Sequence, residues 1–194
     1  MTGGVAAGKS EALGAFGRLG AATISADAIV HDLLDREPML SRLRERWGDG
    51  AVVDGRAERA VIGDRVFNDP AELAWLERQV HPLVRDELAT WLESVEPGTR
   101  FAVAEVPLLF EGEMSDRFDL TVAIVASEDT RQERARSRGH VGVDGRESRQ
   151  LSQGEKADRA DFVVSNDGSP KELETRLKEL LDRLGTELPT DGPG

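Results

Sequence analysis

The sequence predicts an α/β fold in which helices flank a parallel sheet, and three observations lead to this prediction. Apolar runs at residues 22–25, 101–110 and 120–127, and a short one within 160–169, alternate with helical patterns, as in a parallel sheet. The run at 101–110 contains a single carboxylate, which is typical of a strand buried on both faces. A glycine-rich turn near the N-terminus leads directly into the first helix.

The first elements follow from local signals. A helix is predicted from about Lys9 to Arg18, ended by Gly20. The strand at 22–25 comes next. A second helix then begins, and either Ser25 or Asp27 could cap it, because both side chains can accept a hydrogen bond from the first helical turn.

Residues 38–95 are predicted to be helical apart from two breaks. The breaks fall at the turn-like segments 47–56 and 65–70, which are rich in glycine, asparagine, aspartate and proline. Pro82 disfavours helical dihedral angles at the preceding residue, so a break or kink is predicted at His81.

The C-terminal half alternates between charged helices and short strands. Residues 128–139 form a basic helix, and residues 140–158 are polar and are predicted to be mobile. Residues 171–184 carry leucines at helical spacing and form an amphipathic closing helix. The tail at 185–194 is predicted to be disordered.

Composition restricts the class of protein. The 194 residues suffice for one domain with an inserted subdomain. Because the chain has no cysteine, disulfides and thiolate metal sites are excluded. The sequence also shows neither an apolar span nor a signal segment, so a cytoplasmic location without membrane contact is the simplest interpretation. A net charge of −12 argues against nucleic-acid binding, so any anionic ligand requires local Arg, Lys and backbone N–H groups.

Residues 3–10 fit the phosphate-binding pattern G-x-x-x-x-G-K-[ST]. In this pattern backbone N–H groups wrap a nucleotide phosphate, the lysine bridges the outer phosphates and the hydroxyl binds Mg²⁺. A glycine-rich turn that happens to end in Lys-Ser is the alternative, and the helix that follows favours the phosphate loop. The predicted ATP-binding residues are therefore Gly3, Gly4, Val5, Ala6, Ala7, Gly8, Lys9 and Ser10, with Glu11 beside them and Ser10 as metal ligand.

The loop lacks its usual anchor in the sequence. Such a motif normally follows a buried strand, but only Met1 and Thr2 precede it. We expect the first strand to be missing, with a start that lies too late in the chain as the preferred explanation.

Five segments resemble dephospho-CoA kinase in order and spacing: TGGVAAGKS, SADAIVHDLL, RVFNDPAELAWLERQVHPLVR, AEVPLLFE and QLSQGEKADRADFVVSNDGS. Together they span almost the whole chain. The resemblance implies a P-loop kinase that uses ATP and Mg²⁺ to phosphorylate the ribose 3′-hydroxyl of dephospho-CoA, as a monomer or small homo-oligomer. It also implies a nucleotide-binding core at 1–30 and 96–184 with a lid at about 130–157, and a helical substrate domain at 31–95.

The resemblance further implies roles for individual residues. Asp27 matches the catalytic base, although it could instead cap a helix. Arg134 and Arg138, at helical i, i+4 spacing, match cations that neutralise the transferring phosphate, although a solvated basic helix would look the same. Asn166 and Gly168 match the stretch that passes the adenine, or form a plain turn.

The substrate-binding residues implied by the resemblance are Asp27, His81, Arg85, Glu105 and Leu108. His81 could equally be a core histidine. Two positions depart from the family pattern, because Ser25 and Glu105 each replace an Asp. Glu105 lies at the end of a buried strand, where it could bind Mg²⁺ through water, position the substrate or accept a hydrogen bond from a nearby donor.

Two other functions are compatible with the motif. One is another phosphate-loop enzyme; a GTPase is disfavoured because no Asn-Lys-X-Asp string occurs. The other is a degenerate nucleotide-binding module without turnover, which Ser25 and the missing strand suggest.

Overall fold

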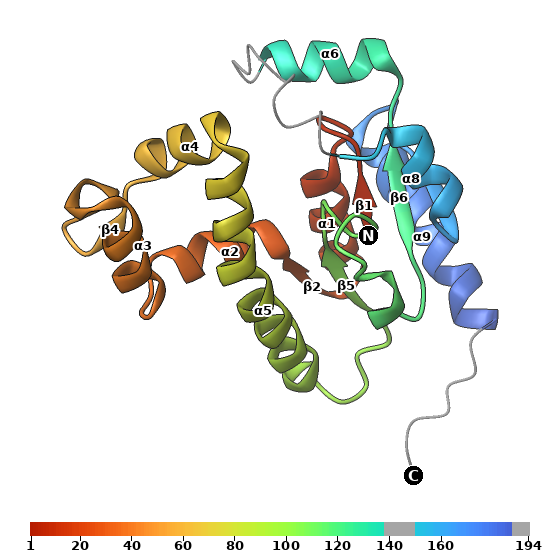
Figure 1. Cartoon of the computed structure of the whole chain (residues 1–194). Helices are drawn as coiled ribbons and strands as arrows, with labels where there is room; N and C mark the ends of the chain where they lie inside the picture. Colours follow the sequence, from red (N-terminus) through yellow and green to blue (C-terminus); the bar gives the residue numbers. More distant parts are fainter. Residues whose placement is uncertain (138–149, 188–194) are drawn as a thin grey trace. The chain divides into compact units, whose positions relative to one another are not determined.

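The computed structural model describes residues 1–137 and 150–187, which form two compact units (Figure 1). Met1–Ile24 and the described part of the chain from Pro97 onward make up the first unit, and Ser25–Glu96 make up the second. Among the described residues, no helix is both long and apolar enough to cross a membrane.

The first unit is built on parallel strands. Strand β1 (Thr2–Gly3) pairs with β6 (Val122–Val125), which pairs with β7 (Phe162–Ser165), and both pairings are parallel. Strand β2 (Ala22–Ser25) pairs with β5 (Ala102–Glu105). The prediction of an α/β fold with a parallel sheet is confirmed.

The prediction that the first strand is missing was wrong, because a short strand is present. Beyond the β1–β6 pairing, the Met1 nitrogen donates to Ala104 O over 2.5 Å, and Met1 O accepts from Val106 N over 2.9 Å. Met1 and Thr2 are buried. Neighbouring strands on both sides thus satisfy backbone groups of Met1, Thr2 and Gly3.

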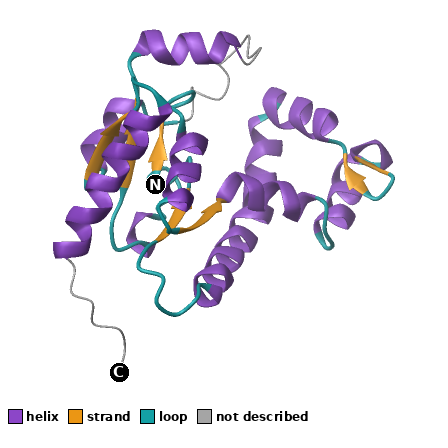
Figure 2. Ribbon diagram, turned by 180° about the vertical axis from the view of Figure 1, so that it is seen from behind, coloured by secondary structure: helices purple, strands orange, loops and turns teal. Residues whose placement is uncertain are grey.

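Helices cover both faces of these strands (Figure 2). Helices α1 (Lys9–Arg18) and α9 (Pro170–Glu187) pack together in a core that includes Phe16, Ile124 and Leu177. Successive strand side chains point to opposite faces, so Thr2 and Ala123 lie on the other face. There α8 (Gln153–Arg159) packs against β1 and β6.

Two further elements complete the described part of the first unit. Helix α6 (Glu128–Ser137) follows β6, and a 3-10 turn, η2 (Ser115–Arg117), lies between β5 and β6. Helix α9 extends to Glu187, so three residues of the segment predicted to be a disordered tail are helical. The remainder of that segment, and residues 140–149 of the polar segment 140–158, lie outside the described residues. From position 153 onward the polar segment, which was predicted to be mobile, belongs to α8, where Lys156 is fully buried.

The second unit is mainly helical and contains a small hairpin. Its helices pack through buried side chains that include Leu43, Val84 and Leu88. The hairpin turns at Asp54-Gly55, where both residues have positive φ, as two-residue hairpin turns require. The elements in order are α2 (Ala26–Leu34), α3 (Met39–Trp47), η1 (Asp49–Ala51), β3 (Val52–Val53), β4 (Arg56–Ala57), α4 (Arg59–Asn68) and α5 (Pro70–Ser94).

Two predicted helix breaks in this unit were wrong in detail. Residues 65–68 belong to α4, and the break falls at Asp69 alone, whose carboxylate caps α5 by accepting from Ala71 N over 2.8 Å. The predicted break at His81 is absent, because α5 continues on both sides of Pro82, whereas the alternative of a kink there stays a prediction. A proline in a long helix costs one backbone hydrogen bond, and the buried face of α5 around Val80 and Val84 outweighs that cost.

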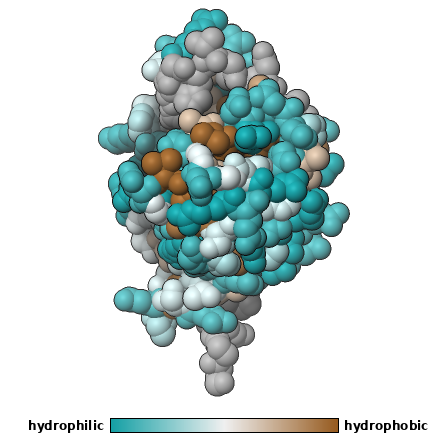
Figure 3. Space-filling model, turned by 60° about the vertical axis from the view of Figure 1, so that its left-hand side comes forward, coloured by the Kyte–Doolittle hydropathy of each residue, from teal (hydrophilic) through white to brown (hydrophobic). Residues whose placement is uncertain are grey.

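The surface is mostly hydrophilic on the face shown in Figure 3, with small hydrophobic areas. Among the described residues, the large hydrophobic side chains that are exposed are Val53, Phe67, Leu92 and Val163.

Candidate active site

The phosphate loop connects β1 to α1 through a strongly curved backbone. Ala7 N donates to Gly4 O over 3.3 Å, which closes a turn at the start of the loop. Ala6 and Gly8 have φ values of 58° and 91°, in the left-handed region. Alternation between left- and right-handed residues directs neighbouring N–H groups into one concavity, so this backbone is suited to holding an anion at the N-terminus of α1.

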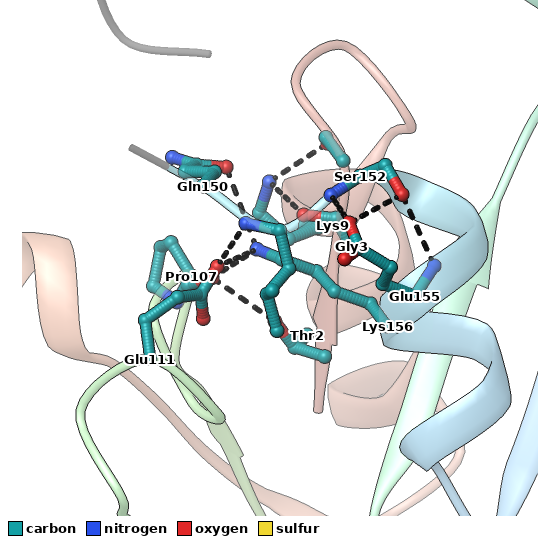
Figure 4. Close-up of polar contacts among 11 residues, drawn as sticks. Thr2, Gly3, Lys9, Pro107, Glu111, Gln150, Ser152, Glu155 and Lys156 are labelled. Atoms are coloured by element: carbon teal, nitrogen blue, oxygen red, sulfur yellow. Dashed lines mark hydrogen bonds and ion pairs between the residues drawn. The ribbon is translucent and has the colours of Figure 1, made fainter. Parts of the chain in front are cut away.

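The side chain of Lys9 folds back over the start of the loop (Figure 4). Its Nζ donates to Gly3 O over 3.1 Å and to Gly4 O over 3.0 Å. Ser10 and Glu11 are exposed on the first turn of α1, and the Glu11 carboxylate accepts from Arg18 Nη2 over 3.0 Å. The loop therefore presents one ammonium group and one hydroxyl beside its backbone donors.

Asn166 holds the loop from the end of β7. Its side chain is buried, and Nδ2 donates to Ala7 O over 2.9 Å. A Cβ atom on Gly8 would lie 2.0 Å from this nitrogen, so the pair leaves no room for a side chain at position 8. The amide of Asn166 is thus engaged by the loop backbone. Gly168 lies two residues before α9, and a Cβ there would meet Glu172 Oε2 at 2.4 Å.

We expect Gly8→Ala to weaken ATP binding about tenfold or more. The new Cβ collides with Asn166, and the left-handed backbone alone costs about 1–2 kcal/mol for a non-glycine residue. Gly20→Ala is a matched control, because Gly20 also has φ 91° but a Cβ there would meet nothing within 4 Å. Calorimetric titration with Mg·ATP should show normal affinity for Gly20→Ala. Equal affinity for both variants would contradict the prediction.

Helix α6 brings two arginines to the loop. Arg134 Nη1 lies 3.4 Å from the position that a Cβ on Gly8 would take, and this buried nitrogen has no hydrogen-bond partner in the described part of the chain. Arg131 Nη1 lies 3.1 Å from the corresponding position on Gly4. Arg138, the other arginine predicted to act in the lid, lies outside the described residues. In the described part of the chain, Arg131 is therefore the second arginine of α6 that lies beside the loop.

Glu105 and Leu108 lie where β5 ends. Glu105 is buried at 5% exposure, and Leu108 is half-buried in the turn that follows. Pro107, between them, accepts two hydrogen bonds at its carbonyl oxygen, from Thr2 Oγ1 over 3.1 Å and from Lys156 Nζ over 2.6 Å. The position of this segment is thereby fixed relative to β1 and α8.

Lys156 is a fully buried cation in α8 (Figure 4). Besides Pro107 O, its Nζ contacts Glu111 Oε1 at 3.2 Å, and the same oxygen accepts from Leu151 N over 2.8 Å. The other oxygen of Glu111 is buried without a hydrogen-bond partner in the described structure. Lys156 thus connects the chain after β5 to α8, a helix that overlaps the C-terminal end of the predicted lid segment.

Replacing Lys156 by Met should lower the free energy of unfolding by about 3–5 kcal/mol, because it leaves the buried Glu111 charge without its cation. For a chain of this size the melting temperature should fall by roughly 10 °C or more. Lys178→Met is the control: its exposed i, i+4 pair with Asp182 contributes less than about 1 kcal/mol. Thermal unfolding of both variants tests the prediction, which fails if they melt together.

Asp27 lies in the second unit, in the first turn of α2, and is exposed. It does not cap the helix. Ser25 occupies the N-cap position, and its side chain makes no capping hydrogen bond. The Asp27 carboxylate follows directly on the end of β2 in the chain, and its place in the first turn suits the positive end of the helix dipole.

His81 and Arg85 lie one turn apart on α5. His81 is exposed, so the alternative that it is a core histidine was wrong. Arg85 is half-buried. Residues at i and i+4 share a helix face, so both side chains can meet the same ligand.

Sequence reasoning missed four residues that the fold places near the loop: Arg131, Gln153, Glu111 and Lys156. Gln153 forms two hydrogen bonds with the backbone of Ala126, over 2.9 Å and 2.8 Å. Arg131 lies three residues before Arg134, and this spacing places both on one helix face, so the sequence could have indicated Arg131. Nothing local marks a buried lysine, because two of the partners of Lys156, Glu111 and Pro107, lie 45 and 49 positions away in the chain.

Known proteins resemble this chain over most of its length. The family model of dephospho-CoA kinase matches residues 1–172. The dephospho-CoA kinase of Chlamydia pneumoniae is 37% identical over 190 residues, covering 95% of this chain and 94% of that protein. The one from Protochlamydia amoebophila is 34% identical over 191 residues, covering 95% and 94%.

Two solved structures share the fold. TT1252 from Thermus thermophilus has a TM-score of 0.78 and 34% identity, with 94% of this chain and 95% of that chain covered. The dephospho-CoA kinase from Campylobacter jejuni has a TM-score of 0.70 and covers 96% of each chain, at 23% identity.

Proposed function

The chain belongs to the dephospho-CoA kinase family, and from this premise we propose that it transfers the γ-phosphoryl group of ATP to the ribose 3′-hydroxyl of dephospho-CoA. The products are ADP and coenzyme A, and the hydroxyl proton is released. The observation that carries the proposal is the family match over residues 1–172 together with a phosphate loop whose lysine and backbone are arranged for a nucleotide.

Catalysis in such a transfer rests mainly on positioning and charge. We assign the N–H groups of residues 3–10 to the phosphates of ATP, and Lys9 to the β and γ phosphates. Asp27 accepts the proton of the attacking hydroxyl; because the transition state is loose, an ordinary carboxylate suffices. Arg134, and Arg138 from the family resemblance, neutralise the charge that is spread over the transferred group.

The residues present suit Mg²⁺ as a partner of ATP. Mg²⁺ usually keeps several waters and takes only one or two protein ligands besides the nucleotide phosphates. The exposed Ser10 hydroxyl beside Lys9 can be such a ligand, and Glu105 can act through water. No cluster of three or more His, Asp or Glu suited to a metal exists among the described residues. When bound, the ion supplies charge neutralisation at the phosphate oxygens.

The acceptor is assigned to the remaining predicted residues. His81 and Arg85, on one face of α5, are donors suited to the phosphate and polar groups of dephospho-CoA. Glu105 and Leu108 supply a carboxylate and an apolar side chain after β5. We further assign the enzyme to the cytoplasm as a monomer or small homo-oligomer.

The test is an ADP-release assay with Mg·ATP, with and without dephospho-CoA, in which mass spectrometry identifies the product. Release of ADP that requires dephospho-CoA, with a phosphorylated product, supports the proposal. ATP binding without release would identify a nucleotide-binding module instead. Release with another small alcohol but not with dephospho-CoA would identify a different phosphate-loop kinase.

A further inference from the structure

Arg131 covers the start of the phosphate loop from helix α6. Its Nη1 lies 3.1 Å from the position that a Cβ on Gly4 would take, so the guanidinium lies directly beside the loop backbone and a side chain at position 4 would crowd it. The side chain is 15% exposed. A largely buried guanidinium in this place is out of bulk water, where its attraction to an anion is strong.

The position of Lys9 indicates which end of the nucleotide Arg131 would meet. Lys9 Nζ donates to the carbonyl oxygens of Gly3 and Gly4, and the lysine of a phosphate loop reaches the β and γ phosphates. Arg131 Nη1 lies beside the same Gly4. Arg131 is therefore at the end of the loop that holds the outer phosphates.

Two residues other than Arg131 fix the beginning of helix α6. Gln153 forms two hydrogen bonds with the Ala126 backbone, and Asp167 Oδ1 accepts from Ser127 N over 2.5 Å. The latter bond, with those from the Ser165 and Ser127 side chains, lowers the pKa of Asp167 to about 2, so the anchor persists at neutral pH. The ion pair of Arg131 with Glu128 is 3.3 Å long, and the Glu128 side chain is 64% exposed, so this pair contributes little.

We propose that Arg131 is a γ-phosphate-binding residue, which donates from its guanidinium to the terminal phosphate of ATP beside Lys9. This inference deepens the proposed function and rests on it only for the identity of the nucleotide. A planar guanidinium can donate two parallel hydrogen bonds to phosphate oxygens. Because ADP lacks the phosphate concerned, Arg131 should distinguish ATP from ADP.

The test compares the affinities of Arg131→Gln and the unchanged protein for Mg·ATP and Mg·ADP, by calorimetry. Losing a hydrogen bond to a charged group predicts a loss of ATP affinity of about 10- to 100-fold, with ADP affinity changed less than about threefold. Arg131→Lys keeps the charge and should fall between the two. Arg136→Gln is the matched control, since Arg136 is exposed on the same helix, and Glu128→Gln tests the ion pair. Both should bind ATP normally.

Three outcomes overturn the inference: unchanged ATP affinity in Arg131→Gln, equal losses for ATP and ADP, or an equal loss in Glu128→Gln. Melting temperatures confirm that each variant is folded, and Arg131→Lys decides the question if Arg131→Gln does not fold. The readout needs no acceptor substrate. If the unchanged protein fails to phosphorylate dephospho-CoA, the proposed function fails while the ATP and ADP comparison still decides the role of Arg131.

Discussion

Asp27→Asn is expected to lower kcat by about 10²–10⁴-fold, the usual effect of losing a general base, while ATP affinity stays nearly unchanged. Asparagine has almost the same shape as aspartate but cannot accept the proton of the attacking hydroxyl. Asp27 is exposed at the start of α2, directly after β2, so the substitution leaves no buried cavity. The measurements are steady-state turnover with dephospho-CoA and calorimetric titration with Mg·ATP.

Asp32→Asn is the control for Asp27. Asp32 lies on the same helix, is 70% exposed and pairs only weakly with Arg36. Its replacement should leave turnover unchanged. An effect of Asp27→Asn on helix stability through the dipole is limited to about 1 kcal/mol, too small for the expected loss of rate. Near-normal turnover of Asp27→Asn would show that another group accepts the proton.

The elements of this fold that the sequence predicted well are those set by local signals. Helix α1 begins at Lys9 and ends at Arg18 as predicted, because a glycine-rich turn precedes it and Gly20 follows. Strand β1 was missed because its two residues form a strand only through pairing with β6, about 120 positions away. Helix α5 passes through Pro82 for a similar reason: its buried face, not its local sequence, decides its length.

The residues of the candidate site likewise fall into those set by local signals and those set by long-range contacts. The phosphate loop at residues 3–10 could be predicted from the sequence, because its function needs a contiguous backbone with fixed spacing. Glu111 and Lys156 could not be predicted, because their roles depend on contacts made across the fold. Asn166 was predicted to lie in the stretch that passes the adenine, and only the structure reveals that its side-chain amide donates a hydrogen bond to Ala7 O.

Lys9→Ala should weaken ATP binding and turnover together, in contrast to Asp27→Asn. Lys9 supplies the ammonium at the start of the loop, where it is held by the carbonyl oxygens of Gly3 and Gly4. Removing one preorganised donor to developing charge typically costs about 10²–10³-fold in kcat. Here the same group also meets the ground-state phosphates, so the KM for ATP should rise as well.

Two controls separate the charge of Lys9 from its packing. Lys171→Ala removes an exposed lysine near the start of α9 and should change neither constant. Lys9→Arg keeps the charge, but a planar guanidinium cannot replace a compact ammonium between two carbonyl oxygens, so only partial activity should return. If Lys9→Ala lowers kcat but leaves ATP affinity intact, the lysine meets the phosphates only in the transition state. If neither constant changes, the loop does not bind phosphate through Lys9, and the nucleotide must lie elsewhere.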